Sequence, residues 1–401
     1  MSVERRSEYD VAIVGAGPAG SSTAIRLAQN GVKVLLIEQK KFPRAKLCGE
    51  FISPECLKHF AELNVLDEMS LAGGVTLNKT VFYARNARSV TVPSEWFEAG
   101  SHALGLSRAE MDQQLLLRAG KVGVEVLEET QAVNLLFENE KVCGVRLRDK
   151  NQNAFEVKAS LTIDATGRSR ILARQIEKIN ENGKRSRADF VAFKTHLAGA
   201  NISDNVCEIY SYRGGYGGCS PVENGLYNLC FIVSSELARK NESHADKILA
   251  NVVLSNSQAA ESLRNASPVE DWLAVPINGY GRANLAPAEG LLSIGDAAGF
   301  IDPFTGSGIL LALESAKLAA EVILSEFSLT ENKPRFATIS ANYRERYGRE
   351  FGRRLFVSSL IRHVAFVPRA ADVVIKCLAA SRTMSRLFAK ATRRSVPAAT
   401  Q

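Results

Sequence analysis

The chain has 401 residues, of which 46% are hydrophobic, and it carries a formal net charge of +7 at pH 7. This length exceeds that of one average domain, and the apolar content is sufficient for a sizeable core, so we expect two or three domains. The first residues, MSVERRSEYD, lack the apolar segment of a signal peptide, and no run of about 18 apolar residues predicts a membrane-spanning helix. Seven cysteines without C-x-x-C spacing favour reduced thiols in a cytoplasmic protein over a disulfide framework or a metal site.

The first segment, YDVAIVGAGPAGSSTAIRLAQNGVKVLLIEQ, predicts a strand, a tight turn, a helix and a second strand. Gly15, Gly17 and Gly20 form a G-x-G-x-x-G loop with Ala19 inside it. In such a loop the first glycine permits the turn, the second admits a pyrophosphate and the third lets helix and strand pack closely. Glu38 ends the second strand, where a carboxylate can accept hydrogen bonds from an adenosine ribose. The segment therefore predicts a dinucleotide site.

Two later segments indicate a second phosphate-and-sugar cradle. In LTIDATGRSRILAR a strand ends at Asp164 and is followed by a turn containing Gly167. In LLSIGDAAGFIDPFTGSGILLALE a strand ends at Gly295 and Asp296, and a loop with Gly306 leads into an apolar helix near Gly308 and Ile309. Asp296 can bond a polyol hydroxyl, and the positive end of the helix would favour an anionic group bound beside it.

Together, these three segments resemble the FAD-dependent oxidoreductases of the geranylgeranyl reductase and aromatic hydroxylase (flavin monooxygenase) superfamily. The resemblance covers roughly residues 8–325 and implies FAD as the cofactor. It also implies that Arg108, in LSRAEMDQQLLLRA, lies at a helix start and reaches the FAD pyrophosphate.

The segment KLCGEFISPE follows the second strand and lies beside the flavin ring in members of this superfamily. Its Cys48 and Gly49 resemble the Cys-Gly pair of geranylgeranyl reductases. Cys48 is either a catalytic thiol facing flavin and substrate or a buried apolar filler, because free cysteines are often inert. Glu50 is either a carboxylate near the ring or a salt-bridged scaffold residue. The Gly-Trp-x-Trp-x-Ile-Pro segment of flavin halogenases is absent, which disfavours a halogenase.

The middle of the chain contains β-like runs separated by glycine-rich turns, which predict an antiparallel sheet. YGGCSP resembles the Tyr-x-Trp-x-Phe-Pro box of geranylgeranyl reductases, with Tyr216 and Pro221 retained. Gly218 and Ser220 replace the two aromatic residues, which indicates a wider pocket. Tyr216 is therefore a candidate catalytic or pocket residue, with a packed sheet tyrosine as the alternative. The five histidines show no metal spacing, so no metal site is predicted.

We expect a Rossmann-like α/β FAD-binding domain formed by residues 1–75, 103–175 and 281–330. Residues 76–102 and 176–280 are expected to form an inserted antiparallel β-sheet domain that binds the substrate. Residues 331–401 are expected to form a basic helical C-terminal extension.

This extension is the basic part of the chain. From residue 335 onward there are 14 Lys and Arg against 3 Asp and Glu, whereas residues 1–334 contain 36 and 40. Basic residues alternate with apolar ones at helical spacing, with a break near Pro368. The segment is interpreted either as helices lying on an anionic membrane or as a cap over the substrate mouth. No recognition motif accompanies the charge, so nucleic-acid binding is not expected.

The leading hypothesis is a cytoplasmic FAD enzyme, peripheral on the inner membrane face, that reduces carbon–carbon double bonds in an isoprenoid-like or polyketide-like substrate. One alternative is an NAD(P)H-dependent FAD monooxygenase that hydroxylates a ring, and another is a non-enzymatic flavoprotein that relays electrons. Since no separate nicotinamide domain is recognisable, NAD(P)H docking transiently or a reduced protein would supply the electrons.

Overall fold

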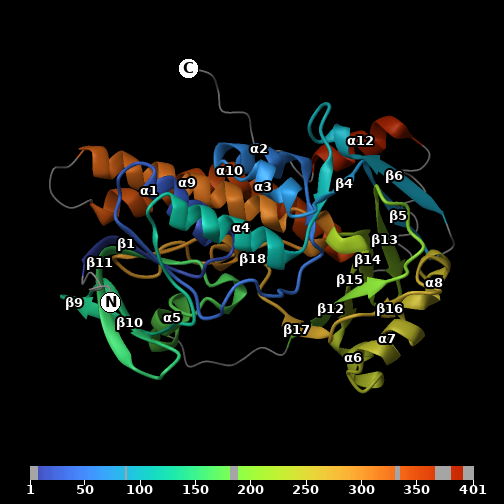
Figure 1. Cartoon of the computed structure of the whole chain (residues 1–401), viewed down its shortest axis with the longest axis horizontal. Helices are drawn as coiled ribbons and strands as arrows, with labels where there is room; N and C mark the ends of the chain where they lie inside the picture. The colour runs from blue at the N-terminus through green and yellow to red at the C-terminus, as the bar shows by residue number, and fades with distance from the viewer. Residues whose placement is uncertain (1–7, 86–87, 181–187, 330–334, 366–380, 392–401) are drawn as a thin grey trace.

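The computed structural model describes residues 8–85, 88–180, 188–329, 335–365 and 381–391. Figure 1 shows two large sheets side by side, with long helices running over the first and short helices beside the second. The expected mixed α/β architecture, with a β-sheet inserted between segments of the nucleotide-binding unit and helices at the C-terminus, is confirmed. The inserted sheet is antiparallel as expected except at one pair of neighbouring strands, which runs parallel.

The first sheet has seven strands in the order β8-β2-β1-β11-β10-β9, and β19 also pairs with β11. The strands β8, β2, β1, β11 and β19 run parallel, whereas β10 pairs with β11 and β9 pairs with β10, both in the antiparallel sense. The bounds are β1 (Glu8–Val14), β2 (Val34–Ile37), β8 (Glu125–Leu127), β9 (Gln131–Glu138), β10 (Lys141–Arg148), β11 (Ala154–Asp164) and β19 (Leu291–Ser293).

Both faces of β1 are buried, as its continuous apolar sequence predicts. Val11 and Ile13 point into the main core with the helices, and Ala12 and Val14 point to the opposite core with the β9–β10 hairpin. The helices are α1 (Pro18–Ala28), α2 (Pro54–Glu62), α3 (Leu66–Leu71), α4 (Arg108–Lys121), α5 (Ala173–Asn180), α9 (Gly308–Leu329) and α10 (Phe336–Ala365). The carboxyl ends of the parallel strands therefore open toward one edge, where loops can form a site.

The second sheet has eight strands in the order β16-β12-β15-β14-β13-β5-β6, and β17 also pairs with β12. Successive side chains along its strands point alternately to the helix-covered face and to the opposite face of the sheet. Phe193, Tyr210 and Phe231 pack beneath three short helices, whereas Ala192 and Ile232 face the other way. The bounds are β5 (Lys79–Tyr83), β6 (Ser89–Pro93), β12 (Phe190–Ala198), β13 (Val206–Tyr212), β14 (Gly215–Pro221), β15 (Tyr227–Ser234), β16 (Ser267–Pro268), β17 (Leu273–Ile277), α6 (Ser235–Lys240), α7 (Ala245–Asn251) and α8 (Ser257–Ser262).

Two small sheets complete the described strands. One contains β3 (Phe51–Ile52), β7 (Ala103–Gly105) and β4 (Val75–Leu77), and the other pairs β18 (Gly281–Arg282) with β20 (Gly299–Phe300). The first lies where the chain passes between the two large sheets, since β5 begins directly after β4 and α4 begins shortly after β7.

The C-terminal helices pack on the rest of the molecule. Tyr343, Tyr347 and Phe351 of α10 are buried in the main core against α9, and Arg354 forms an ion pair with Glu314 of α9. The last described helix, α12 (Arg382–Ala391), lies against β6 (Figure 1). The predicted break near Pro368 lies outside the described residues. Of the helices that are described, none is long and apolar enough to cross a membrane.

Candidate active site

A continuous cavity of about 900 Å³ lies between the strand ends of the first sheet and the open face of the second. Its first part, which we call the cradle, is formed by residues 14–19, 37–40, 44–50, 108, 165–168 and 294–296. Its second part, which we call the chamber, is bounded by the second sheet, residues 300–309 and the C-terminal helices. The loop that carries Cys48 lies where these two parts meet.

The glycine loop is shaped by close backbone approaches. Gly15 has a φ of +106°, and a Cβ on it would lie 2.4 Å from the carbonyl oxygen of Ala165. A Cβ on Gly20 would lie 1.8 Å from the carbonyl oxygen of Gly15, so helix α1 can pack this closely only with glycine there. Gly15, Gly17 and Ala19 line the cradle, whereas Gly20 lies behind it and supports the turn.

Glu38 is buried at the end of β2 and lines the cradle. Its carboxylate accepts hydrogen bonds from the backbone N–H groups of Ala16 (3.1 Å) and Lys40 (3.0 Å). Since a carboxylate has about four acceptor positions, it retains capacity for ribose hydroxyls. This is the role that the sequence predicts for Glu38.

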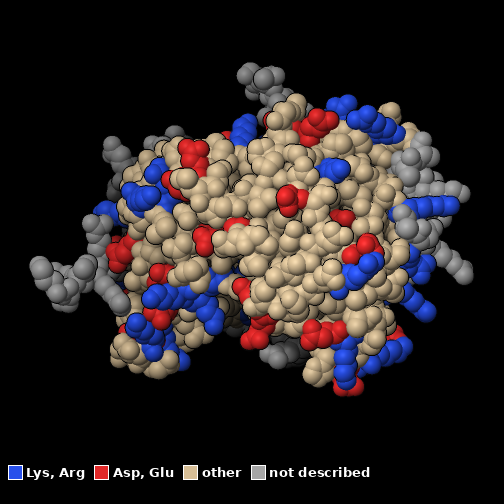
Figure 2. Space-filling model, turned by 45° about the vertical axis from the view of Figure 1, so that its right-hand side comes forward, with Lys and Arg blue, Asp and Glu red and all other residues tan. Residues whose placement is uncertain are grey.

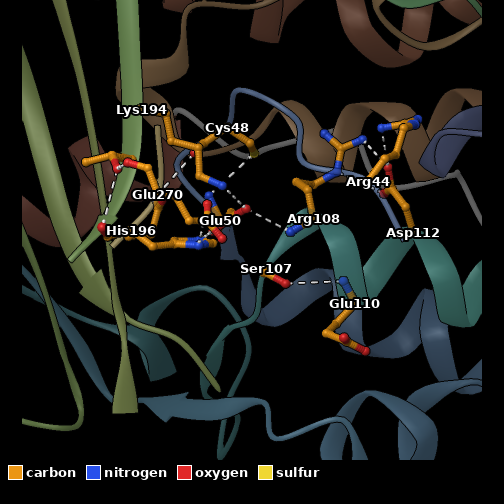
Figure 3. Close-up of polar contacts among 12 residues, drawn as sticks. Arg44, Cys48, Glu50, Ser107, Arg108, Glu110, Asp112, Lys194, His196 and Glu270 are labelled. Atoms are coloured by element: carbon orange, nitrogen blue, oxygen red, sulfur yellow. Dashed lines mark hydrogen bonds and ion pairs between the residues drawn. The ribbon is translucent and has the colours of Figure 1, made fainter. Parts of the chain in front are cut away.

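Arg108 begins helix α4, as predicted, and lines the cradle. Its guanidinium donates two hydrogen bonds to Asp112 at 2.8 and 2.7 Å, and one of its nitrogens lies 3.7 Å from where a Cβ on Gly17 would be. Figure 3 shows Arg44 reaching the same carboxylate, at 3.3 Å. Two cations held by one buried acid beside the glycine loop are suited to a pyrophosphate.

Asp164 does not line the cavity, contrary to its predicted place among the cofactor contacts. It is buried at the end of β11, and its two oxygens accept from Thr166, Leu172 and Ala173. These bonds fold the turn back on itself, so Asp164 shapes the residues that do face the cavity, including Gly167 and Arg168.

Gly295, Asp296, Gly306, Gly308 and Ile309 all line the cavity, and helix α9 begins at Gly308 as expected. Burial raises the pKa of Asp296, although the positive charges of Arg168, Arg108 and Lys46 oppose this effect. A carboxylate held in a costly environment beside open space is suited to accept a hydrogen bond from a ligand hydroxyl.

Cys48 and Gly49 line the cavity at the junction of cradle and chamber. The Cys48 sulfur accepts from the backbone N–H of Glu50 at 3.4 Å, and its carbonyl accepts from the Asn228 amide at 3.2 Å. Glu50 itself is fully buried and bonded to Lys194 and His196, both at 2.7 Å (Figure 3). These contacts agree with the interpretation of Glu50 as a salt-bridged scaffold residue.

Tyr216 is buried on the chamber wall, and its hydroxyl donates to Asp302 at 2.6 Å. Its ring meets Phe304 edge to face, with 5.0 Å between ring centroids. Burial and the Asp302 charge raise the pKa of Tyr216 far above its ordinary value. The Tyr216 ring forms part of the chamber wall. Its hydroxyl proton is used in the hydrogen bond to Asp302, and this bond holds the loop after β20 in place.

The chamber wall consists of alternate residues from six neighbouring strands. Their side chains are small or apolar, and they include Gly218 and Ser220, the two positions where the sequence lacks aromatic residues. The wall residues are Ala192, Cys230, Ile232, Tyr216, Gly218, Ser220, Cys207, Ile209, Ser211, Thr80, Phe82, Val90 and Val92. At its far end the chamber reaches Leu360 of α10 and Ser385 and Ala389 of α12.

Several functional candidates were not identified from the sequence. Arg44, Lys46 and Arg168 line the cradle, and each lies within three residues of a recognised motif residue or its loop. Lys194 and His196 carried no local signal, because their partner Glu50 is 144 and 146 residues away. No group of three or more His, Cys, Asp or Glu in the described ranges could hold a metal ion.

The cradle fits FAD. Its two close glycine approaches leave room for a pyrophosphate, and the carboxylates of Glu38 and Asp296, which are suited to accept from ligand hydroxyls, both line it. The family model for the FAD binding domain matches residues 8–328, which confirms FAD as the cofactor.

Comparisons with known proteins find relatives and solved structures that are similar over most of the chain. Digeranylgeranylglycerophospholipid reductase of Methanosarcina acetivorans is 31% identical over 326 residues, covering 80% of this chain and 76% of the relative. A myxobacterial chondrochloren halogenase has the same fold, with a TM-score of 0.79 and 23% identity over 97% of this chain and 91% of that one. A geranylgeranyl bacteriochlorophyll reductase-like protein of Thermoplasma acidophilum also has this fold, with a TM-score of 0.75 and 21% identity. The match covers 98% of this chain and 94% of that one.

Proposed function

This chain belongs to the FAD-binding domain family and is an FAD-dependent oxidoreductase, and we propose that it reduces carbon–carbon double bonds in a long, isoprenoid-like lipid chain. The observation that carries this proposal is the chamber, which continues from Cys48 across six adjacent strands to α12. At the usual spacing of strands, five steps across the sheet span roughly 24 Å. A chamber of this length with small and apolar walls is suited to an extended hydrocarbon chain.

We propose Cys48 as the proton donor that such a reduction requires. Bound FAD in its reduced form supplies the hydride that adds to one carbon of the double bond. The other carbon then needs a proton, and the Cys48 thiol lies where the cradle and chamber meet. Hydrogen bonds to its sulfur and carbonyl fix the thiol in place. The positive end of α9, at Gly308, faces the same region and favours negative charge there.

The test is an anaerobic single-turnover experiment. The purified flavoprotein is photoreduced and mixed with a geranylgeranyl-chain phospholipid, and flavin reoxidation and lipid saturation are recorded. We expect reoxidation together with loss of double bonds, and Cys48→Ser should slow this step while leaving FAD content intact. NAD(P)H and a reduced ferredoxin-type protein are then compared as electron donors.

Two outcomes would overturn the proposal that this chain is a reductase. Oxygen consumption in proportion to NAD(P)H, with a hydroxylated product, would establish the monooxygenase instead. Flavin reduction by a protein partner without turnover of any lipid would establish the electron relay.

We also propose that α10 and α12 rest on an anionic bilayer, so that the lipid chain enters the chamber from the membrane. Phe356 and Leu387 are 64% exposed, and Leu360 and Met384 are more than half exposed on the same two helices. Exposed Arg353, Arg382 and Arg386 lie beside them. Figure 2 shows Lys and Arg side chains at the upper right of the molecule, with an acidic group beside them, and both signs of charge below. Apolar and basic side chains on one helix face favour a membrane surface.

Point variants test this proposal better than deletion of the tail, because α10 supplies core aromatic residues. Phe356→Ser with Leu387→Ser should lower flotation with anionic liposomes, and added salt should do the same. Phe137→Ser is the matched control, since Phe137 is 51% exposed on β9 of the first sheet. Equal flotation of all three proteins would reject the membrane surface and favour the capping role.

A further inference from the structure

The loop that carries Cys48 is held against the second sheet by hydrogen bonds and ion pairs. Asn228 on β15 donates to the Cys48 carbonyl, and Lys194 and His196 on β12 bind both oxygens of Glu50. His196 pairs directly with Asn228 in the sheet, so these three side chains form one patch on two neighbouring strands. On the other side, the backbone N–H at the start of α4 donates to Glu50 at 2.8 Å. Glu50 thus connects both halves of the molecule to the loop.

Glu50 occupies a backbone conformation that other contacts must maintain. Its φ is +51°, in the left-handed region that residues with a side chain seldom adopt. In this conformation the N–H of Glu50 points to the Cys48 sulfur. A backbone held in this way persists only when the surrounding structure determines it, and here the buried carboxylate supplies that restraint.

The charge states support a closed arrangement near neutral pH. Burial alone would raise the pKa of Glu50, but the hydrogen bond from His196 and the charge of Lys194 outweigh it, and the pKa is lowered. Burial alone would lower the pKa of His196, but the hydrogen bond and charge of Glu50 outweigh it, and the pKa is raised. Glu50 is therefore a carboxylate and His196 an imidazolium in the same pH range.

His196 also connects this interior network to the surface. Its second ring nitrogen lies 3.2 Å from the carboxylate of Glu270, whose side chain is 49% exposed (Figure 3). The charged groups around the ring are therefore Glu50 on the loop, Lys194 on its own strand and Glu270 before β17. The imidazole can exchange its proton near solvent while its other nitrogen holds Glu50.

We propose that Glu50 is a positioning residue that fixes the Cys48 thiol between cofactor and substrate, and that His196 makes this restraint dependent on pH. The proposal deepens the proposed function, because it assigns a device that orients the proton donor of that site. When His196 loses its proton, Glu50 loses one of its two cationic partners, and the loop opens more often. The Cys48 thiol is then less well placed.

The test measures how fast iodoacetamide alkylates Cys48 in the oxidised, FAD-loaded protein, with each cysteine followed by peptide mass spectrometry. Glu50→Gln should accelerate alkylation of Cys48 by about tenfold, the effect of losing one charge-assisted hydrogen bond. Cys143 on β10 reacts in the same sample and serves as the internal reference, since it lies in the first sheet. Glu110→Gln is the matched control, because it removes a carboxylate from the first turn of α4 without touching the loop.

The pH dependence separates positioning from simple packing. In the wild type, the ratio of Cys48 to Cys143 alkylation should show an inflection above pH 6.5, from the raised His196 pKa. His196→Gln keeps a hydrogen-bond donor but should lose this inflection. Glu270→Gln should move it to lower pH, because the Glu270 charge helps to raise the His196 pKa.

Unchanged Cys48 alkylation in Glu50→Gln, with FAD content retained, would overturn the positioning role. An unchanged pH profile in His196→Gln would overturn the role of His196. If Glu50→Gln does not fold, the other two variants still decide the pH-dependent part and Asn228→Ala replaces it as the loop-opening variant. Because alkylation requires no lipid turnover, these outcomes are independent of whether the enzyme is a reductase or a hydroxylase.

Discussion

The two large sheets build their parts of the cavity in different ways. The first sheet buries both faces and contributes only the loops at its strand ends, so the cradle consists largely of backbone and charged side chains. The second sheet buries one face and gives the other to the cavity, so the chamber consists of alternate side chains from six strands. The cradle is therefore defined by conformation and charge, whereas the chamber is defined by side-chain volume. Substitutions in the two regions should fail for different reasons.

The largest effect is expected where the cradle depends on backbone contact. Gly20→Ala places a methyl group 1.8 Å from the Gly15 carbonyl oxygen, and α1 must move away from β1. We expect a loss of stability of about 3 kcal/mol, typical of overpacking, measured by chemical denaturation. Gly352→Ala is the control, since nothing lies within 4 Å of the new methyl group on α10. A Gly20→Ala protein as stable as wild type would contradict the close approach.

Gly17→Val should separate cofactor binding from folding. The nearest atom to a Cβ at this position belongs to the flexible end of Arg108, 3.7 Å away, so the chain itself has room for a side chain. The pyrophosphate must occupy this space, and we expect a folded protein that contains almost no flavin. Absorbance of the purified protein and its circular dichroism measure the two properties. Normal FAD content would show that the pyrophosphate does not cross Gly17.

In the chamber, Ser220→Phe should leave FAD content unchanged and reduce turnover. Ser220 is buried on the chamber wall, and a phenyl ring there would fill part of the path of the substrate. We expect a loss of roughly 5- to 160-fold with long lipid chains and a smaller loss with short ones, since a steric clash of about 1–3 kcal/mol has this effect. Ser267→Phe, on exposed β16, is the control. An equal loss for all chain lengths would argue against a linear chamber.

The smallest effect concerns Asp296, where function and stability should oppose each other. Its folded-state pKa is raised, so the folded protein holds this proton more tightly than the unfolded chain does. Wild-type stability without FAD is therefore lost as pH rises from the ordinary value of 3.8 through the folded pKa. Asp296→Asn should melt at a higher temperature than wild type at neutral pH, by a margin that vanishes in acid. It should also bind FAD more weakly.

A lower melting temperature for Asp296→Asn at neutral pH would contradict the burial of an unfavourable charge. Stronger FAD binding would contradict the role of Asp296 as an acceptor.

The difference between the two regions also explains what the sequence could predict. The glycine loop, Glu38 and the start of α4 were predictable because each is a local pattern within a strand, a turn and a helix. The alternation of β12 and β15 predicted strands but not which face remains open, because that depends on where α6 to α8 pack. Glu50 could not be assigned because its partners come from a different sheet. Asp164 has the expected position at the end of its strand, but its carboxylate accepts hydrogen bonds from the turn that follows the strand and does not face the cavity.

The packing of α10 on α9 affects the order in which this chain can fold during synthesis. Strand β1 leaves the ribosome first, yet it pairs with β11, and its core is completed by Tyr343, Tyr347 and Phe351. Apolar side chains in the first half of the chain therefore remain exposed until nearly the whole chain has been synthesised. We expect nascent chains that stop before residue 336 to depend on chaperones, and a messenger truncated there to yield aggregates rather than a smaller flavoprotein.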